Sequence, residues 1–207
     1  MPASSGADRV PGPGPVPGLV GVVLAAGQSR RFGGDKRWAD YRGRPLIAHA
    51  LAVARSVCPR VLLVVDRPQA ALAGLAEADA TEVVVCPGAI GGLSASRGCA
   101  LSRIVAEAER PAGLLFFLGD MPELPPDEAR RVAWRMLDSG RPVRPVHAGS
   151  PGHPVAFPGR LLETLHAAGG KDLRAVFSLE EGDVLASSHP GVCRDVDLPS
   201  DLPETTG

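Results

Sequence analysis

Short apolar segments alternate with longer segments of helical period from residue 19 onward, and no other feature of the sequence limits the possible folds as much. The apolar segments have the length of strands, and they stand at 18–25, 60–66, 81–86 and 112–120. The segments between them have the period of helices, and they stand at 45–57, 68–78 and 91–109. Strands that are apolar on both faces are typical of a parallel sheet covered by helices. We therefore predict an α/β fold with three layers, helix, sheet and helix, and a mostly parallel sheet.

The two ends of the chain depart from this alternation. After Asp120 the pattern predicts a helix at 126–139, a hairpin of two short strands within 141–159, helices near 158–168 and 171–181, and strands at 183–188 and 194–198. The first 18 residues alternate Pro and Gly without an apolar period, which is typical of a disordered tail. With 207 residues, of which 44% are hydrophobic, the chain is long enough to bury one core. We expect a tail at 1–18 and a single domain at 19–203.

The charge balance and the cysteines limit the partner and the compartment. A formal net charge of -1 gives no overall attraction to nucleic acid or to an anionic membrane, so we expect a small partner and neither of these. The cysteines have no metal-binding spacing, and we expect reduced thiols at Cys58, Cys86, Cys99 and Cys193. The sequence has neither a signal-peptide pattern nor an apolar run of about 18 residues, which favours the cytoplasm.

The first candidate site follows the strand expected at 18–25. Residues 25–27 have almost no side chain, so a ligand can approach the backbone, and the N–H groups that follow can bind phosphate. Positive charge comes next, at Arg30, Arg31, Lys36 and Arg37. The loop matches neither the Walker A nor the GxGxxG pattern. A Gly-rich turn with a solvated basic face is an equally good interpretation of this loop alone.

Carboxylates follow two other expected strands. Asp120 comes directly after an apolar strand, and Asp195 and Asp197 fall two apart on the strand expected at 194–198, so their side chains point to the same side. Carboxylates that face a phosphate-binding loop suit Mg²⁺, because hard cations take oxygen ligands and share phosphates. A turn or capping role for Asp120 and a solvated edge strand for the other two acids stay open. Ligands bind at the carboxyl ends of parallel strands, so three such ends together favour a nucleotide site.

Five segments resemble one family in sequence and in order. The segments "LAAGQSRRFGGDK", "GGLSAS", "GDMP", "PGHPVAF" and "DVDLPSDL" run from Leu24 to Leu202. They resemble the molybdenum cofactor nucleotidyltransferases, most closely the cytidylyltransferase branch. The first segment is shared widely among nucleotidyltransferases, whereas "GLSAS" with "PGHPV" narrows the family. The resemblance implies a MobA-like NTP transferase domain with the Rossmann-like three-layer fold of the nucleotide-diphospho-sugar transferases.

The resemblance also implies roles for individual residues. Arg31 and Lys36 match the basic residues at the triphosphate, and with Asp120 they are the implied catalytic residues. Asp120 and Asp197 match the Mg²⁺ ligands, with Asp195 as a helper. His153, in the loop 152–154, matches the side that faces the pterin-bearing substrate, although ordering its own loop is an equally good role. The implied nucleotide-binding positions are Leu24, Ala25, Ala26, Gly27, Lys36, Gly92, Leu93 and Ser94.

The reaction that the resemblance implies is Mg²⁺-dependent transfer of CMP from CTP to the molybdenum cofactor (molybdopterin), with release of pyrophosphate. Catalysis would rest on alignment and charge, without a protein nucleophile. Ala26 in "LAAG" favours CTP, whereas "GGDK" resembles the guanylyltransferase branch, so GTP stays open. Methylerythritol phosphate is disfavoured as the acceptor because the "PK" pair of that family is missing. An inactive carrier of the cofactor is the alternative from another class, and the family suggests a molybdoenzyme or its chaperone as a partner.

Overall fold

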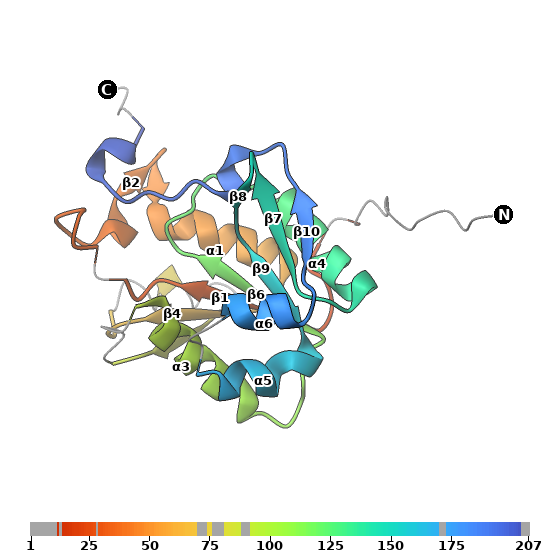
Figure 1. The fold of residues 1–207 in the computed structure, drawn as a ribbon. Helices are drawn as coiled ribbons and strands as arrows, with labels where there is room; N and C mark the ends of the chain where they lie inside the picture. Colours follow the sequence, from red (N-terminus) through yellow and green to blue (C-terminus); the bar gives the residue numbers. More distant parts are fainter. Residues whose placement is uncertain are drawn as a thin grey trace.

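The computed structural model describes residues 12, 14–27, 29–69, 74–75, 81–87, 92–169 and 173–203. Over these residues the main sheet has eight strands in the order β10-β7-β9-β6-β1-β4-β5, with β8 paired to β7 (Figure 1). The strands are β1 (Leu19–Leu24), β4 (Arg60–Val65), β5 (Thr81–Val85), β6 (Gly113–Leu118), β7 (Val143–His147), β8 (Ser150–Pro151), β9 (Val155–Pro158) and β10 (Asp183–Ala186). A separate two-stranded sheet pairs β2 (Asp40–Tyr41) with β3 (Arg44–Pro45).

Most neighbouring strands of the main sheet run in the same direction. β1 is parallel to β4 and β6, β5 is parallel to β4, and β10 is parallel to β7. β9 lies between β6 and β7 and is antiparallel to both, while β8 forms a hairpin with β7. The prediction of a mostly parallel sheet is confirmed. The antiparallel strands come from the segment in which the sequence predicted a hairpin.

Two groups of helices cover the two faces of the sheet (Figure 1). The helices are α1 (Leu46–Val57), α3 (Leu93–Val105), α4 (Pro126–Ser139), α5 (Leu162–Ala167) and α6 (Leu173–Leu179), with the short 3-10 turns η1 (Lys36–Trp38), η3 (Gly159–Leu161), η4 (Pro190–Val192) and η5 (Pro199–Asp201). α1 and α4 pack on one face, whereas α3, α5 and α6 pack on the other. The three predicted layers are therefore present. No helix within the described residues is long and apolar enough to cross a membrane.

The central strands show how one sheet serves two cores. All six residues of β1 are buried. Val23 and Phe117 belong to the cluster under α1 and α4, whereas Val22 and Phe116 belong to the cluster under α3, α5 and α6. Consecutive side chains of a strand point to opposite faces. Because both faces are covered, these strands are apolar at every position rather than at alternate ones.

The C-terminal segment differs from its prediction. The strand expected at 194–198 is wrong, since these residues form no strand in the structure. The N–H of Val196 donates instead to the carbonyl of Asp120 across 2.9 Å. The segment therefore runs along the end of β6 without joining the ladder of the sheet, which a period-two pattern cannot distinguish from an edge strand.

Two of the cysteines also differ from their prediction. Cys86, directly after β5, and Cys99 on α3 form a disulfide with their Cα atoms 6.0 Å apart. Cys58 and Cys193 are free. The expectation of four reduced thiols is therefore wrong for the first pair. The bond depends on how α3 packs beside β5, and this tertiary contact leaves no mark in the spacing of the cysteines.

Two predictions fall mostly outside the described residues. The helix expected at 68–78 is one, because only 68–69 and 74–75 are described there; 74–75 are helical, whereas 68–69 are not. The disordered tail at 1–18 is the other, and it stays a prediction. Within that range, Val16 is 3% exposed and its N–H donates to the carbonyl of Val57 across 2.7 Å. Packing against the core thus begins before residue 19, where the domain was expected to start.

Candidate active site

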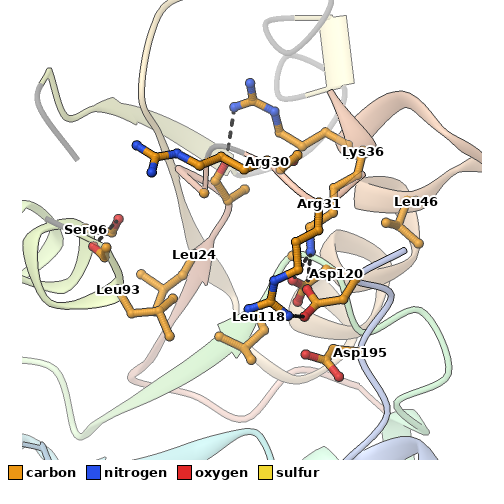
Figure 2. Close-up of a pocket in the computed structure, with 17 residues that line it drawn as sticks. Leu24, Arg30, Arg31, Lys36, Leu46, Leu93, Ser96, Leu118, Asp120 and Asp195 are labelled. Carbon is orange, nitrogen blue, oxygen red and sulfur yellow. Dashed lines mark hydrogen bonds and ion pairs between the residues drawn. The ribbon is translucent and has the colours of Figure 1, made fainter. Parts of the chain in front are cut away.

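A cavity of about 510 Å³ opens at the carboxyl ends of β1 and β6. This volume is within the range of small-molecule sites, roughly 300–1,000 Å³. Most of the residues predicted from the sequence line it, namely Leu24, Ala25, Gly27, Arg31, Lys36, Gly92, Leu93, Asp120, Asp195 and Asp197. Figure 2 shows Leu24 and Leu93 on one side of the cavity and Lys36, Asp120 and Asp195 on the other, with Leu46 on the side of the charged residues. The cavity therefore offers an apolar wall and an ionic wall to one ligand.

Three predicted residues do not belong to this lining. Ala26 is 2% exposed and packs in the core beside α3, so its side chain does not face the cavity. Ser94 lies in the first turn of α3, where its Oγ accepts a hydrogen bond from Arg97 Nη2 across 3.3 Å. His153 lies in the loop before β9. The indication of CTP from Ala26 therefore rests on the family resemblance and not on a contact of its side chain.

The cavity also includes residues to which the sequence analysis gave no role in the site. Leu46, Ser96 and Leu118 line it. Ser96 lies three residues after Leu93 on α3, so helical spacing places both on the same face and could have indicated it. Leu118 is the last residue of β6, and its place at a strand end was a similar signal. Leu46 had no such signal, because its position depends on the packing of α1.

Lys36 lies at the centre of the ionic wall (Figure 2). Its Nζ donates to Asp120 Oδ2 across 2.7 Å, to the carbonyl of Val196 across 2.8 Å and to Asp197 Oδ1 across 3.1 Å. Burial alone would lower the pKa of Lys36, but Asp120 and Asp197 raise it above its ordinary value. Lys36 is therefore a fixed positive charge at neutral pH.

Arg31 is the more exposed of the two predicted phosphate-binding residues. Its Nη1 lies 3.0 Å from Asp197 Oδ2, and its side chain is 77% exposed. A pair this open to solvent contributes little to stability. Arg31 can therefore leave Asp197 for the phosphate of a ligand at small cost. The turn that carries these residues passes through Gly33, whose φ of 76° is in the left-handed region that glycine adopts without strain.

Asp120, Asp195 and Asp197 form a carboxylate group opposite the loop. Each offers one oxygen, and these oxygens all lie within 4.8 Å of one another. Burial, and then the charges of Asp120 and Asp197, raise the pKa of Asp195. Asp120 Oδ1 is buried and has no hydrogen-bond partner among the described residues. An all-oxygen donor set with an unsatisfied buried oxygen fits a hard divalent cation such as Mg²⁺ or Mn²⁺.

Gly119 explains why Asp120 can lie so close to the loop that follows β1. A Cβ at Gly119 would lie 2.8 Å from Ile47 Cδ1, closer than real Cβ atoms approach. The N–H of Gly119 donates to the carbonyl of Leu24 across 3.0 Å. Because glycine leaves this space free, β6 stays against β1 up to the point where Asp120 begins.

Asp201 holds the C-terminal acids in place. Its Oδ2 accepts hydrogen bonds from the N–H groups of Asp197 and Leu198, across 2.9 and 2.7 Å. These bonds form the start of η5. They direct the segment so that Asp195 and Asp197 reach Asp120 although the predicted strand is absent.

His153 is uncharged at neutral pH. Its Nδ1 lies 3.3 Å from the carbonyl of Phe116, so Nδ1–H donates and Nε2 keeps its lone pair. Burial lowers the pKa of His153 to about 4, and the positive charges of Arg144 and Arg97 act in the same direction. A role of His153 toward a substrate stays a prediction.

Basic side chains and carboxylates thus converge on one cavity at the carboxyl edge of a mostly parallel sheet, the place where α/β proteins bind ligands. Comparison with known families gives a more specific answer. The MobA-like NTP transferase domain matches residues 21–185, which is most of the chain. The chain belongs to this family of nucleotidyltransferases.

Individual relatives differ in how much of the chain they match. A 2-C-methyl-D-erythritol 4-phosphate cytidylyltransferase from Cereibacter sphaeroides is 45% identical over 64 residues, which are 27% of this chain and 28% of that protein. A molybdenum cofactor guanylyltransferase from Pseudomonas putida is 38% identical over 84 residues, which are 37% of this chain and 43% of that protein. The match spans less than half the length of either curated relative.

One solved structure is similar over nearly its whole length. Rv0371c from Mycobacterium tuberculosis H37Rv has a TM-score of 0.68 and 28% sequence identity, with 88% of this chain and 94% of that chain covered. A complex of Rv0371c with manganese has a TM-score of 0.62 and 28% identity, with 82% of this chain and 88% of that chain covered.

Proposed function

We propose that the protein transfers CMP from CTP to the molybdenum cofactor, a molybdopterin, and releases pyrophosphate. The observation that carries this proposal is the convergence of Lys36 with Asp120 and Asp197 beside the bare backbone of 25–27. A loop of this kind accepts phosphates, and the carboxylates opposite accept a cation that phosphates share. The family match supports the reaction class.

In this proposal the two walls of the cavity bind different parts of the nucleotide. Leu24, Leu93 and Leu118 offer an apolar surface for the base and ribose. Arg31 and Lys36 offer positive charge to the triphosphate, Arg31 as a planar fork and Lys36 as a point charge. Together they hold the nucleotide with its α-phosphorus toward the carboxylates.

Asp120, Asp195 and Asp197 would hold a divalent cation, Mg²⁺ in this proposal. Their oxygen donors fit such an ion, and the similar protein Rv0371c has been crystallised with manganese. When bound, the cation neutralises charge on the phosphate oxygens. Lys36 already lies against Asp120 and Asp197, and its hydrogen bonds hold these two carboxylates beside the cavity.

In the proposed reaction, an oxygen of the acceptor's terminal phosphate forms a bond to the α-phosphorus of the nucleotide. The bond from the α-phosphorus to the bridging oxygen breaks, and pyrophosphate leaves with the electron pair. Lys36 and Arg31 stabilise the charge on this leaving group, so no protein nucleophile is needed. The unprotonated Nε2 of His153 offers an acceptor for an N–H of the pterin.

GTP is the second candidate nucleotide, and the match to the Pseudomonas putida guanylyltransferase favours it. The test is pyrophosphate release from CTP and from GTP in parallel, with Mg²⁺ and molybdenum cofactor, and with methylerythritol phosphate as a second acceptor. The variant is Asp120→Ala. The matched control is Asp127→Ala, because Asp127 is an acid at the start of α4 whose side chain is 91% exposed.

Release from CTP with molybdenum cofactor that only Asp120→Ala abolishes would support the proposal. Release from GTP alone would change the nucleotide, and release with methylerythritol phosphate alone would change the acceptor. Nucleotide binding without turnover of either nucleotide would favour the inactive carrier. Activity that survives Asp120→Ala would contradict the role of the carboxylates.

A further inference from the structure

The guanidinium of Arg37 is buried beneath the nucleotide loop, which we define as residues 25–27 and 29–36. Its side chain is 6% exposed. Nε and Nη2 donate to the two oxygens of Asp35 across 2.6 and 2.7 Å. Nη1 donates to Asp66 Oδ1 across 2.9 Å and to the carbonyl of Ala25 across 3.1 Å. Four of the five N–H groups of Arg37 are therefore used within the protein.

These contacts give Arg37 an environment that differs from that of the exposed Arg31 in the same loop. Burial alone would lower the pKa of Arg37, but hydrogen bonds and the charges of Asp35 and Asp66 raise it. The guanidinium therefore stays charged and stays paired. Arg37 contributes to the lining of the cavity, but because four of its five N–H groups are already used it has little to offer a phosphate, in contrast to the exposed Arg31. A role in binding phosphate does not account for a buried arginine here.

The partners of Arg37 come from three different places in the chain. Ala25 follows β1, Asp66 follows β4, and Asp35 immediately precedes Lys36. The N–H of Ala25 donates to the carbonyl of Val64 across 2.9 Å, so both polar groups of Ala25 are held. In a trans peptide the carbonyl and the following N–H point in opposite directions. Holding the carbonyl of Ala25 therefore also fixes the direction of the next N–H, that of Ala26.

A second group of contacts secures Asp35 from outside. Gln69 Nε2 donates to Asp35 Oδ2 across 3.0 Å, and Trp38 Nε1 donates to Gln69 Oε1 across 2.9 Å. Asp35 also caps η1, accepting from the backbone N–H of Arg37 across 3.3 Å. The turn that starts at Lys36 is thus anchored at its first residue. Since Lys36 begins this turn, its direction toward Asp120 depends on the anchor.

We propose that Arg37 is a positioning residue of the nucleotide site: its guanidinium ties the ends of β1 and β4 to the turn that carries Lys36. This shapes the loop backbone for the nucleotide and directs Lys36 to the carboxylates before any ligand arrives. The inference rests on the proposed function for its nucleotide, but the ordering of the loop is a property of the protein alone. Preorganisation of this kind improves affinity because binding then orders fewer groups.

The test compares Arg37→Lys with Arg130→Lys. Arg130 is the matched control because it is also buried, at 8% exposure, and pairs with one carboxylate and one carbonyl, those of Asp127 and Ser56, on α4 and α1. A lysine keeps the charge at both positions but carries it on one ammonium, so it cannot reproduce the bonds that the three separate nitrogens of the planar Arg37 guanidinium make to Asp35, Asp66 and Ala25. Asp66→Asn is a second variant, which removes one anchor and leaves Arg37 in place.

Two measurements are made on each variant: hydrogen–deuterium exchange of the amides at 29–36, and the affinity for CTP and for GTP with Mg²⁺ by calorimetry. We expect Arg37→Lys to speed exchange in the loop and to weaken nucleotide binding, each by about tenfold or more, because charge-assisted bonds are lost. Asp66→Asn should change both in the same direction by less. Arg130→Lys should change neither beyond its effect on global stability.

Loop exchange in Arg37→Lys that rises no more than in Arg130→Lys would overturn the inference. Faster exchange with unchanged nucleotide affinity would overturn the link between the anchor and the site. If the wild-type protein binds neither nucleotide, the proposed function fails, whereas the exchange data still decide whether Arg37 orders the loop.

Discussion

Lys36 Nζ and Asp120 Oδ2 lie 2.7 Å apart although 84 residues separate them in the chain. The ammonium also donates to Asp197 Oδ1 across 3.1 Å, so it bridges two of the three carboxylates that Asp120, Asp195 and Asp197 bring together. Lys36 therefore compensates these carboxylates in the metal-free protein. A divalent cation would use oxygens of the same carboxylate groups, so its binding and the contacts of Lys36 are coupled.

The first prediction concerns this coupling. Lys36→Met should lower the free energy of unfolding of the metal-free protein by about 1–2 kcal/mol, because partly buried carboxylates lose a partner. Millimolar Mn²⁺ should then stabilise the variant more than the wild type, since no ammonium has to be displaced. Thermal unfolding with and without Mn²⁺ measures both effects. Arg42→Met is the control, because Arg42 is 66% exposed and pairs with Glu123 outside the cavity. Equal Mn²⁺ shifts in all three proteins would contradict the coupling.

Replacing Asp195 by asparagine should affect stability and metal binding in opposite directions. Burial, Asp120 and Asp197 all raise the pKa of Asp195, so its charge is held at a cost. Asp195→Asn should therefore leave the metal-free protein as stable as the wild type or more stable, and weaken Mn²⁺ binding about tenfold or more. Denaturant unfolding and calorimetry provide the two values. Asp138→Asn, at an exposed acid on α4, should change neither. A clear loss of metal-free stability in Asp195→Asn would refute this account.

His153 should make stability depend on pH in a defined window. The pKa of His153 is about 4 in the folded protein and 6.5 ordinarily. As the pH falls, His153 is therefore protonated in the unfolded chain before it is protonated in the folded protein. The stability that the neutral ring provides is complete above pH 6.5, falls as the pH drops from 6.5 to 4, and changes no further below that.

The variant His153→Gln should remove this part of the pH dependence, which amounts to about 3 kcal/mol at most. Urea unfolding at a series of pH values compares it with the wild type. His189→Gln is the control, because His189 is exposed. If the wild type and His153→Gln lose stability in parallel between pH 6.5 and 4, His153 does not titrate as the structure requires.

The cysteines predict a thiol count. Cys86 and Cys99 are joined, burial raises the pKa of the Cys58 thiol to about 12, and Cys193 is half-buried. In the absence of reductant, a thiol reagent should therefore find one reactive group in the folded protein and two in denaturant. After reduction in denaturant it should find all four. Four thiols in denaturant before reduction would show that Cys86 and Cys99 are free thiols and not a disulfide.

Much of the fold could be predicted because both faces of the sheet are covered. Strands such as β1 and β6 are apolar at every position, and helices such as α1 and α4 have a clear period, so their types and near bounds follow from the sequence. The segment 194–198 could not be predicted in this way. Its alternation of acids and apolar residues has the period of a strand, but its hydrogen bonds go to Asp120 and Asp201 and not to a neighbouring strand.

The candidate site was predictable where function depends on residue type at a strand end. Asp120 carries its charge just after the buried strand β6, and that contrast is visible in the sequence. Lys36 and Asp197 lie at no strand end of the structure, and the family resemblance indicated them. Arg37 carries the same charge as Lys36 in the same loop, yet the structure gives it a different role. Whether an arginine faces a ligand or lies under the loop depends on Asp66, which is brought near only by the pairing of β1 with β4.

The direction of β9 has a consequence for how such a site can change. Because β9 runs against β6 and β7, the loop that precedes it, at 152–154, reaches the carboxyl edge of the sheet, and the loop that follows it lies at the far edge. The nucleotide loop precedes η1 on the other side of β6. Under the proposed function, the loop at 152–154 faces the acceptor, so insertions or substitutions before β9 would alter the choice of acceptor while β1, β4 and β6 keep their register.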